Sequence, residues 1–249
     1  SSTYPLDIYP AYRIARHYHA KLIYEVHDLW PLSPMELGGY SKKHPFIRIM
    51  QKAEDDCYRY ADAVVSMLPK AEEHMREHGL TRDKFHYVPN GIVLSDWNNP
   101  KGIPEEHGLL LSKLRAEGKF IVGFAGAHGI ANSLYAVIDA VSSLTEQNVV
   151  LVLVGGGQEK ENLIKYAHKK GVTNVYFLLP INKLAIPNLL KEMDVLYIGL
   201  QKQSLFRFGI SPNKMFDYMM AAKPIIQAID AGNNLVREAD CGIDVEPDN

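Results

Sequence analysis

The stretch Val149-Val150-Leu151-Val152-Leu153-Val154-Gly155-Gly156-Gly157 joins six consecutive apolar residues to three glycines. An apolar run without polar alternation is typical of a strand that is buried on both faces of a parallel sheet. Six further apolar runs alternate with helical stretches along the chain, at residues 22–26, 63–65, 120–125, 175–179, 195–200 and 225–229. This repeated strand-helix-strand order predicts an α/β fold built on parallel sheets.

Chain length and turn-forming residues predict two domains. The chain has 249 residues, whereas a domain usually has roughly 100 to 200. Asn98-Asn99-Pro100 and Gly102-Ile103-Pro104 interrupt the alternation, as expected where the chain passes between domains. We therefore expect a partial N-terminal Rossmann-like lobe at 1–98, a linker at 99–118 and a C-terminal Rossmann-like lobe at 119–249. The first lobe supplies three strands at most and the chain opens on Ser1-Ser2-Thr3 rather than on Met, so we expect that lobe to be truncated.

Composition excludes several classes of protein. The 27 Lys and Arg against 29 Asp and Glu give a net charge of −2, which provides no general field for nucleic acid. Cys57 and Cys241 are the two cysteines of the sequence, too few for a disulfide framework or a four-Cys zinc site, and this usage favours the cytoplasm. The longest apolar runs are far shorter than the ~20 residues that span a bilayer.

Glycines follow two of the expected strands, where open parallel sheets bind their ligands. Gly123 to Gly129 ends one strand and precedes a helix that begins near Asn132. Glycine lets the backbone approach a phosphate closely, and the amides of a helix start favour an anion. The spacing is not that of the dinucleotide fingerprint, so a tight strand-to-helix turn is an equal alternative. Gly155 to Gly157 follows the next strand in the same way, with a flexible turn as the alternative.

The segment Gly209 to Pro224 carries a second indication of an anion site. Pro212 and Asn213 predict a helix start that places Lys214 in the first turn, where its charge opposes the helix dipole unless an anion lies nearby. Asp217 lies on the same helical face and has the chemistry to accept hydrogen bonds from two neighbouring hydroxyls, as a carboxylate does with ribose. The alternative is a surface ion pair between Lys214 and Asp217.

Gly209 to Pro224, followed by Ile225-Ile226, resembles the donor-sugar nucleotide segment of glycosyltransferase family 4. Family members are retaining enzymes of the two-lobed GT-B fold. The resemblance covers nearly the whole chain, and further matching motifs occur in the family's order at 24–28, 88–92, the loop at Gly126, 154–157 and 174–177. The Ser211-Pro212-Asn213-Lys214 turn is similar to that of a bacterial subgroup that includes transferases of N-acetylated amino sugars in surface-polysaccharide synthesis.

The resemblance implies a nucleoside diphosphate sugar as donor, with UDP favoured, and a glycan or lipid-linked acceptor. It implies that the backbone of Ile181 meets the base and that Asn90 faces the cleft, although Asn90-Gly91 is equally a turn signal. The expected donor-binding residues are Gly126, Ser211, Lys214, Asp217, Ile181 and Asn90. Members of this fold commonly use no metal in catalysis, so we expect no cofactor and no metal ion.

His27 and Asp28 follow the first strand and are the expected catalytic residues. The resemblance places His27 opposite the transferred sugar, where it contacts sugar hydroxyls and steadies charge while Asp28 orients its ring. A lone histidine after a strand is more often structural, and the family context is what reverses that preference. Glu25 points to the same side of the strand and is a second polar candidate.

Two positions depart from the family's pattern. Many members carry two glutamates eight positions apart, and here Gly209 takes the first place and Asp217 the second. An Arg/Lys pair that often follows the first glycine loop is replaced by Ala127 to Asn132. Lys214, with Arg207 as a weaker candidate, therefore has to carry more of the diphosphate charge.

Three other patterns favour ordinary surface structure. His74-Met75-Arg76-Glu77-His78 matches the H-x-x-E-H zinc peptidase pattern, but it belongs to a charged helix closed by Gly79, which is typical of a solvated face. Asp55-Asp56 lies in a helical stretch rather than in a metal-binding loop. The basic, aromatic stretch Tyr12 to Lys21, with Ser41 to His44, allows peripheral contact with an anionic membrane at its inner face, but a solvated helix and loop is the favoured alternative.

These observations together favour a retaining transfer of a sugar, by an enzyme that resembles hexosyl- or N-acetylhexosaminyltransferases. A nucleotide-sugar 2-epimerase, which releases a free sugar without an acceptor, is one alternative. A non-catalytic two-lobed sugar-binding protein is another. We also expect that these 249 residues bind donor without turnover, because the acceptor lobe is incomplete.

Overall fold

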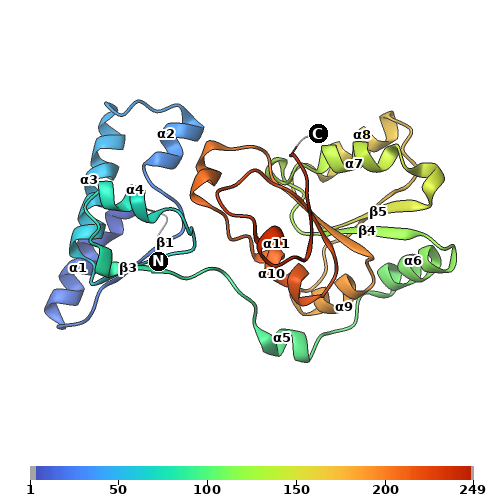
Figure 1. Cartoon of the computed structure of the whole chain (residues 1–249), viewed down its shortest axis with the longest axis horizontal. Coiled ribbons are helices and arrows are strands. Elements are labelled where there is room, and N and C mark those ends of the chain that lie inside the picture. Colours follow the sequence, from blue (N-terminus) through green and yellow to red (C-terminus); the bar gives the residue numbers. More distant parts are fainter. Residues whose placement is uncertain (1–3, 248–249) are drawn as a thin grey trace. The chain divides into compact units, whose positions relative to one another are not determined.

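The computed structural model describes residues 4–247, which fold into two compact units (Figure 1). The first unit contains residues up to 90 together with 203–211 and 231–233. The second unit contains residues 91–202, 212–230 and those from 234 onward. The opening Ser1-Ser2-Thr3 lies outside the described residues. Both units are α/β structures with parallel sheets, which confirms the expected fold class.

The first unit is a three-stranded parallel sheet in the order β1-β2-β3, with helices between the strands. All three strands are parallel, and Ile23 pairs with Ala63 while Val64 pairs with Phe85. The elements in chain order are η1 (Pro5–Asp7), α1 (Ile8–His17), β1 (Ile23–Val26), α2 (Leu32–Gly38), α3 (Pro45–Tyr60), β2 (Ala63–Ser66), α4 (Glu72–Glu77), η2 (Arg82–Lys84) and β3 (Phe85–Tyr87).

The segment η6 (Ser204–Phe208) completes the core of the first unit. Val26, Tyr58 and Met75 are almost fully buried in that core, and Phe208 packs against it. The backbone N of Lys70 donates to the carbonyl oxygen of Phe208 at 2.9 Å. This hydrogen bond fixes η6 to the loop after β2. The first unit is therefore assembled from parts of the chain that are more than a hundred positions apart.

The second unit is a six-stranded parallel sheet in the order β6-β5-β4-β7-β8-β9. This order places the change of winding direction between β4 and β7, which is the topological switch point of a classic doubly wound fold. Its elements are α5 (Leu94–Asn98), α6 (Glu105–Ala116), β4 (Phe120–Ala125), η3 (Ile130–Asn132), α7 (Leu134–Ser142), η4 (Thr145–Gln147), β5 (Val149–Val154), α8 (Lys160–Lys169), β6 (Val175–Leu178), η5 (Lys183–Ala185), α9 (Ile186–Lys191), β7 (Val195–Gly199), α10 (Asn213–Met220), β8 (Ile225–Ala228), α11 (Leu235–Glu238) and β9 (Gly242–Asp244).

Helices cover both faces of the second sheet, which explains its unbroken apolar strands. Figure 1 shows α7 and α8 together on one face, and Phe124 and Leu151 of the sheet share a buried cluster with these helices. Gly123, the neighbour of Phe124 on β4, turns the other way, where an added Cβ would overlap the side chain of Met193 after α9. Strands with partners on both faces have no use for polar alternation.

The structure differs from the sequence-based strand assignment mainly at the sheet edges. β3 and β9 have three residues each and lie at sheet edges, and neither contains an apolar run. The expected linker range 99–118 contains α6, which buries Leu111 and Leu114 in the second unit. Within residues 4–247, none of the helices is both long enough and apolar enough to cross a membrane.

Candidate functional site

Loops that carry two of the predicted donor residues and the second group of glycines leave the carboxyl ends of β4, β5 and β6, which are neighbours in the second sheet. Gly126 follows β4, Gly155 to Gly157 follows β5, and the half-buried Ile181 follows β6. Because the strands are parallel, these loops share one edge of the sheet beside the switch point, where such folds bind their ligands.

The two glycine loops pack backbone on backbone. A Cβ on Gly155 would overlap the carbonyl oxygen of Gly126, and a Cβ on Gly157 would lie 2.5 Å from the carbonyl oxygen of His128. His128 N donates to the carbonyl oxygen of Gly156 at 2.7 Å, and Gly126 N donates to the end of β5 at 3.0 Å. These glycines are therefore required by close approach between the loops.

Lys214 lies in the first turn of α10, as the sequence predicts, and points at the loop after β4. Its Nζ donates to Oδ1 of Asn132 at 2.6 Å and lies 4.4 Å from the centre of the Phe124 ring. A Cβ on Gly126 would lie 3.2 Å from the same Nζ. No carboxylate of residues 4–247 forms an ion pair with Lys214, and burial lowers its pKa to about 8. A half-buried amine whose hydrogen-bond partner is a neutral amide is suited to receive an anion.

Two further nitrogen-bearing side chains lie at the loops after β4 and β5. Lys160 donates from Nζ to the carbonyl oxygens of Gly155 and Leu178 at 2.9 and 2.7 Å. The ring of His128 is fully buried, and neither ring nitrogen has a hydrogen-bond partner among the described residues. Burial, followed by the charges of Lys160 and Lys214, lowers the pKa of His128 to about 4, so this ring is neutral near pH 7. The loops are thus surrounded by amines and a neutral imidazole.

Asp217 is half-buried three residues after Lys214 on α10. Its Oδ1 accepts a hydrogen bond from Nε1 of Trp97 at 3.4 Å, and burial raises its pKa while Trp97 and Lys183 act in the opposite direction. A pocket of about 170 Å³ lies against this carboxylate and is lined by residues of the second unit that include Asp96, Pro187 and Asn213. Lys214 and Asp217 have different partners, so the expected alternative of a surface ion pair between them does not form.

A hydrogen bond from the sheet holds α10 in place. The backbone N of Ala125, at the end of β4, donates to the hydroxyl oxygen of Tyr218 at 3.0 Å. Tyr218 is 1% exposed, so this bond is shielded from water. It fixes the helix that carries Lys214 and Asp217 to the strand that carries Gly126.

Asn90 and Ser211 meet within the first unit. Asn90 N donates to Oγ of Ser211 at 2.8 Å, and Nδ2 of Asn90 donates to the carbonyl oxygen of Ser211. Ser211 is 6% exposed. Their pairing orders the chain just before α10, because Ser211 is three residues before Lys214.

His27 and Asp28 follow β1 in the first unit, as predicted. The carboxylate beside the ring is that of Glu25, whose Oε1 lies 3.6 Å from Nε2 of His27. Both side chains are exposed, at 41% and 49%. Among the described contacts Asp28 makes no hydrogen bond with His27, and the contact with Glu25 is longer than a hydrogen bond.

Arg207 has a carboxylate partner in the first unit. Its guanidinium contacts both oxygens of Glu36, with Nη1 at 2.8 Å and Nη2 at 2.6 Å. This contact lowers the pKa of Glu36. Arg207 therefore forms a bidentate ion pair with Glu36, whereas Lys214 has a neutral amide as its partner.

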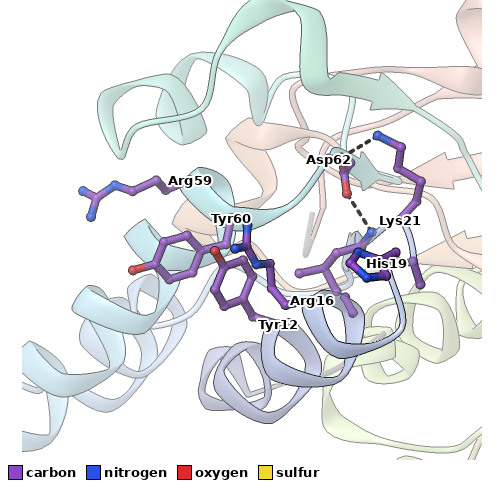
Figure 2. A pocket seen from close by; sticks show the side chains of 10 residues that line it. Tyr12, Arg16, His19, Lys21, Arg59, Tyr60 and Asp62 are labelled. Carbon is purple, nitrogen blue, oxygen red and sulfur yellow. Dashed lines mark hydrogen bonds and ion pairs between the residues drawn. The ribbon is translucent and has the colours of Figure 1, made fainter.

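Residues of the basic, aromatic stretch Tyr12 to Lys21 line a pocket of about 550 Å³ in the first unit. Figure 2 shows Tyr12 and Tyr60 side by side at its wall, with their ring centres 4.5 Å apart, and Arg16 beside them. Lys21 is joined to Asp62 at 2.9 Å. The pocket therefore holds both signs of charge.

Sequence reasoning did not single out Asn132, His128 or Trp97 as site residues. Asn132 and His128 lie in the glycine loop, within the segment that replaces the Arg/Lys pair. Their place in that loop is the sequence feature that could have identified them as site residues. Trp97 contacts Asp217 from 120 positions earlier in the chain, and no local pattern indicates that contact.

Two protein families match the chain. The glycosyl transferase 4-like domain matches residues 2–91, and the glycosyl transferases group 1 family matches residues 111–247. Among curated proteins, the chain is 24% identical over 215 residues to the putative teichuronic acid biosynthesis glycosyltransferase TuaH of Bacillus subtilis (strain 168). That match covers 83% of this chain and 50% of TuaH, so the chain spans about half the length of this relative.

Solved glycosyltransferases have the same fold. The Anabaena Alr3699/HepE structure in complex with UDP and glucose superposes with a TM-score of 0.63 at 18% identity, covering 98% of this chain and 62% of that one. WaaG, a glycosyltransferase involved in lipopolysaccharide biosynthesis, gives a TM-score of 0.65 at 17% identity and covers 94% and 66%. At these identities the likeness concerns the fold, which is the GT-B fold.

Proposed function

Because the chain belongs to the glycosyl transferases group 1 family, we propose that it provides the donor site of a retaining glycosyltransferase that uses a nucleoside diphosphate sugar as donor. UDP is the favoured nucleotide, which is consistent with the UDP and UDP-glucose complexes of HepE. The acceptor is a hydroxyl of a glycan or of a lipid-linked glycan. The Ser211-Pro212-Asn213-Lys214 turn supports an N-acetylated sugar as the transferred group. The same turn and the likeness to TuaH support a role in surface-polysaccharide synthesis.

The environment of Lys214 carries this proposal. The amine is half-buried in the first turn of α10, its pKa is lowered to about 8 by burial, and a neutral amide is its hydrogen-bond partner. A diphosphate would supply the negative charge that this position lacks. Lys214 and the amides near Gly126 would then stabilise the charge that develops on the leaving diphosphate as the glycosidic bond breaks.

The remaining roles follow from where the side chains lie. Asp217 would accept hydrogen bonds from the ribose hydroxyls, with Trp97 steadying the carboxylate, and the backbone of Ile181 would meet the base. Ser211 and Asn90, paired in the first unit, would order the chain before α10 and contact the donor. His27 and Asp28 would act on the hydroxyls of the transferred sugar, with Glu25 beside the imidazole as a second polar candidate.

The reaction we propose needs no nucleophilic carboxylate. The bond between the anomeric carbon and the diphosphate oxygen breaks, and the acceptor oxygen bonds to the same face of that carbon. The acceptor proton passes to the departing phosphate oxygen. In this scheme the side chains and amides at the diphosphate stabilise its charge, so no metal ion is required. The reaction takes place in the cytoplasm, with peripheral membrane contact where the acceptor is lipid-linked.

Isothermal titration calorimetry with UDP, GDP and ADP tests the donor site. We expect one nucleotide, UDP, to bind, and we expect both Lys214→Ala and Asp217→Ala to weaken binding by about tenfold or more, since each removes a charged contact. Lys169→Ala on α8 is the matched control, because Lys169 is exposed and its loss should leave UDP affinity unchanged.

Failure of the folded wild-type chain to bind any of the three nucleotides would contradict the proposal and favour the sugar-binding alternative. Incubation with UDP-sugar alone separates transfer from epimerisation. Release of a free, epimerised sugar without acceptor would favour the 2-epimerase.

A further inference from the structure

Helices α3 and α4 of the first unit bring together a carboxylate and two imidazoles. One oxygen of Glu54 and one nitrogen each of His74 and His78 lie within 4.8 Å of one another. Oε1 of Glu54 is 3.7 Å from Nε2 of His74, and the two imidazole ring centres are 4.8 Å apart. The two histidines are four residues apart, so both lie on one face of the α4 turn. The exposed Glu73, Arg76 and Glu77 form the solvated face expected from sequence, whereas the two imidazoles lie off that face.

Glu54 is a buried carboxylate without a Lys or Arg partner among the described residues. Its side chain is 1% exposed. Tyr58 donates its hydroxyl to Oε1 at 2.8 Å and Gln51 donates from Nε2 to Oε2 at 2.7 Å. A charge that is removed from water is stabilised by an opposite charge or by a metal ion. The neighbouring Asp56 has such partners in Lys52 and Arg59, whereas Glu54 has neutral donors.

His74 has an unused nitrogen that lies next to this carboxylate. Its side chain is 13% exposed, and Nε2 is buried without a hydrogen-bond partner among residues 4–247. The other ring face is occupied, because Phe208 lies 5.4 Å from the imidazole between ring centres. A buried polar atom without a partner is rare in a native structure, and a bound ion or water is one explanation for it.

We propose that Glu54, His74 and His78 bind one Zn²⁺ ion that clips α3 to α4. Two imidazole nitrogens and one carboxylate oxygen form a ligand set that zinc uses in proteins, with a water molecule in the fourth position. The spacing of 3.7 Å between Oε1 of Glu54 and Nε2 of His74 is close to the ~3.3 Å that bonds of ~2.0 Å give in a tetrahedron. The ion neutralises the buried carboxylate and uses the unpaired Nε2 of His74.

Asp55 is a positioning residue for this site. Its Oδ1 lies 3.1 Å from Nδ1 of His78, and the same Nδ1 lies 2.8 Å from the Gln51 amide. A carboxylate beside a ligating imidazole orients the ring and raises its basicity. A pocket of about 510 Å³, lined by Gln51, Asp55, His74 and His78 among others, gives an ion a path from solvent.

The geometry differs from that of a zinc peptidase. The glutamate of the H-x-x-E-H pattern is Glu77, which is exposed on α4, and the carboxylate beside the imidazoles is Glu54 from another helix. The ion therefore has a structural role, since it ties two helices that pack on the same core.

Calorimetric titration of the chelator-treated chain with Zn²⁺ tests the site. We expect one ion per chain, a higher Tm when Zn²⁺ is present, and loss of more than about 100-fold in affinity in Glu54→Gln and in His74→Gln, which remove a ligand each. Asp55→Asn keeps all three ligands, and its affinity should fall by about 10- to 100-fold. His86→Gln, on exposed β3, is the matched control and should bind Zn²⁺ like the wild type.

Substitution with Co²⁺ gives a readout that does not depend on any variant folding. We expect visible absorption of a four-coordinate ion with nitrogen and oxygen ligands, without the thiolate band that Cys57 or Cys241 would produce. Absence of stoichiometric Zn²⁺ binding by the wild-type chain would overturn the proposal. A thiolate band, or unchanged affinity in a folded His74→Gln, would do the same.

Discussion

Two buried clusters in this chain have opposite imbalances of charge. Around the glycine loops of the second unit, Lys214 and Lys160 donate to an amide and to carbonyl oxygens, and His128 is buried between aromatic rings. Between α3 and α4 of the first unit, Glu54 is buried beside imidazoles and neutral donors. The first arrangement suits an anion and the second a cation. The net charge of −2 conceals both, so the sign of a ligand is indicated by local partners rather than by composition.

Gly155→Ala should give the largest effect on the cationic cluster. Its Cβ would overlap the carbonyl oxygen of Gly126, so the two glycine loops have to separate and Lys214 loses its neighbour. We expect a loss of about 3 kcal/mol or more in the free energy of unfolding and loss of UDP binding. Urea unfolding followed by circular dichroism measures the first, and calorimetry the second.

Gly156→Ala is the control for this substitution. A Cβ on Gly156 would lie 3.8 Å from the ring of Pro180, an ordinary contact distance. We expect stability within about 0.5 kcal/mol of the wild type. If both alanine variants behave alike, the close packing of the loops does not shape the site.

His128 should make the second unit sensitive to acid. Its pKa is lowered from 6.5 to about 4, so between those values the unfolded chain binds more protons and stability falls as the pH drops. We expect up to about 3 kcal/mol of wild-type stability to be lost through this group between pH 6.5 and 4. The difference in unfolding free energy between wild type and His128→Leu, measured across that range, isolates the effect. A pH-independent difference would show that folding does not lower the pKa of His128.

Lys214→Met should raise stability while it weakens nucleotide binding. The folded pKa of about 8 lies below the unfolded value of 10.5, so the charged amine destabilises the fold by up to about 3 kcal/mol at pH 7, and less where water reaches it. The gain in the variant should be full below pH 8 and fade as the pH rises to 10.5. Thermal unfolding without nucleotide at pH 7 and pH 10 measures it. A variant less stable than wild type at pH 7 would mean that the amine already has its counter-charge.

Asn132→Asp should give Lys214 the carboxylate that its cluster lacks. Oδ1 of Asn132 lies 2.6 Å from the amine, so the aspartate should form an ion pair and raise the pKa of Lys214. We expect UDP affinity to fall by about tenfold, because the new charge competes with the diphosphate. Calorimetry at two salt concentrations tests this, with Glu161→Gln on exposed α8 as a control for altered net charge. Undiminished affinity would place the diphosphate away from Lys214.

The sequence predicts the strands that are apolar and doubly covered, and it places Lys214 in the first turn of α10. The edge strands β3 and β9 give no such signal, because half-exposed or exposed strands of three residues need no apolar run. The contact of Trp97 with Asp217 and that of Glu54 with His74 depend on how helices pack. Periodicity says which face of a helix is buried, but not which polar group that face meets. The roles of the donor residues stay predictions.

Residues 203–211 and 231–233 of the first unit are synthesised long after the rest of that unit. Residues 4–90 emerge from the ribosome first, yet Phe208 and residues 231–233 belong to the same unit. At ~5 to 20 residues per second, about 7 to 30 s pass between the emergence of residue 90 and that of residue 233. During that interval the early sheet has to remain available in a nascent chain, and this is when we expect a chaperone to be most useful.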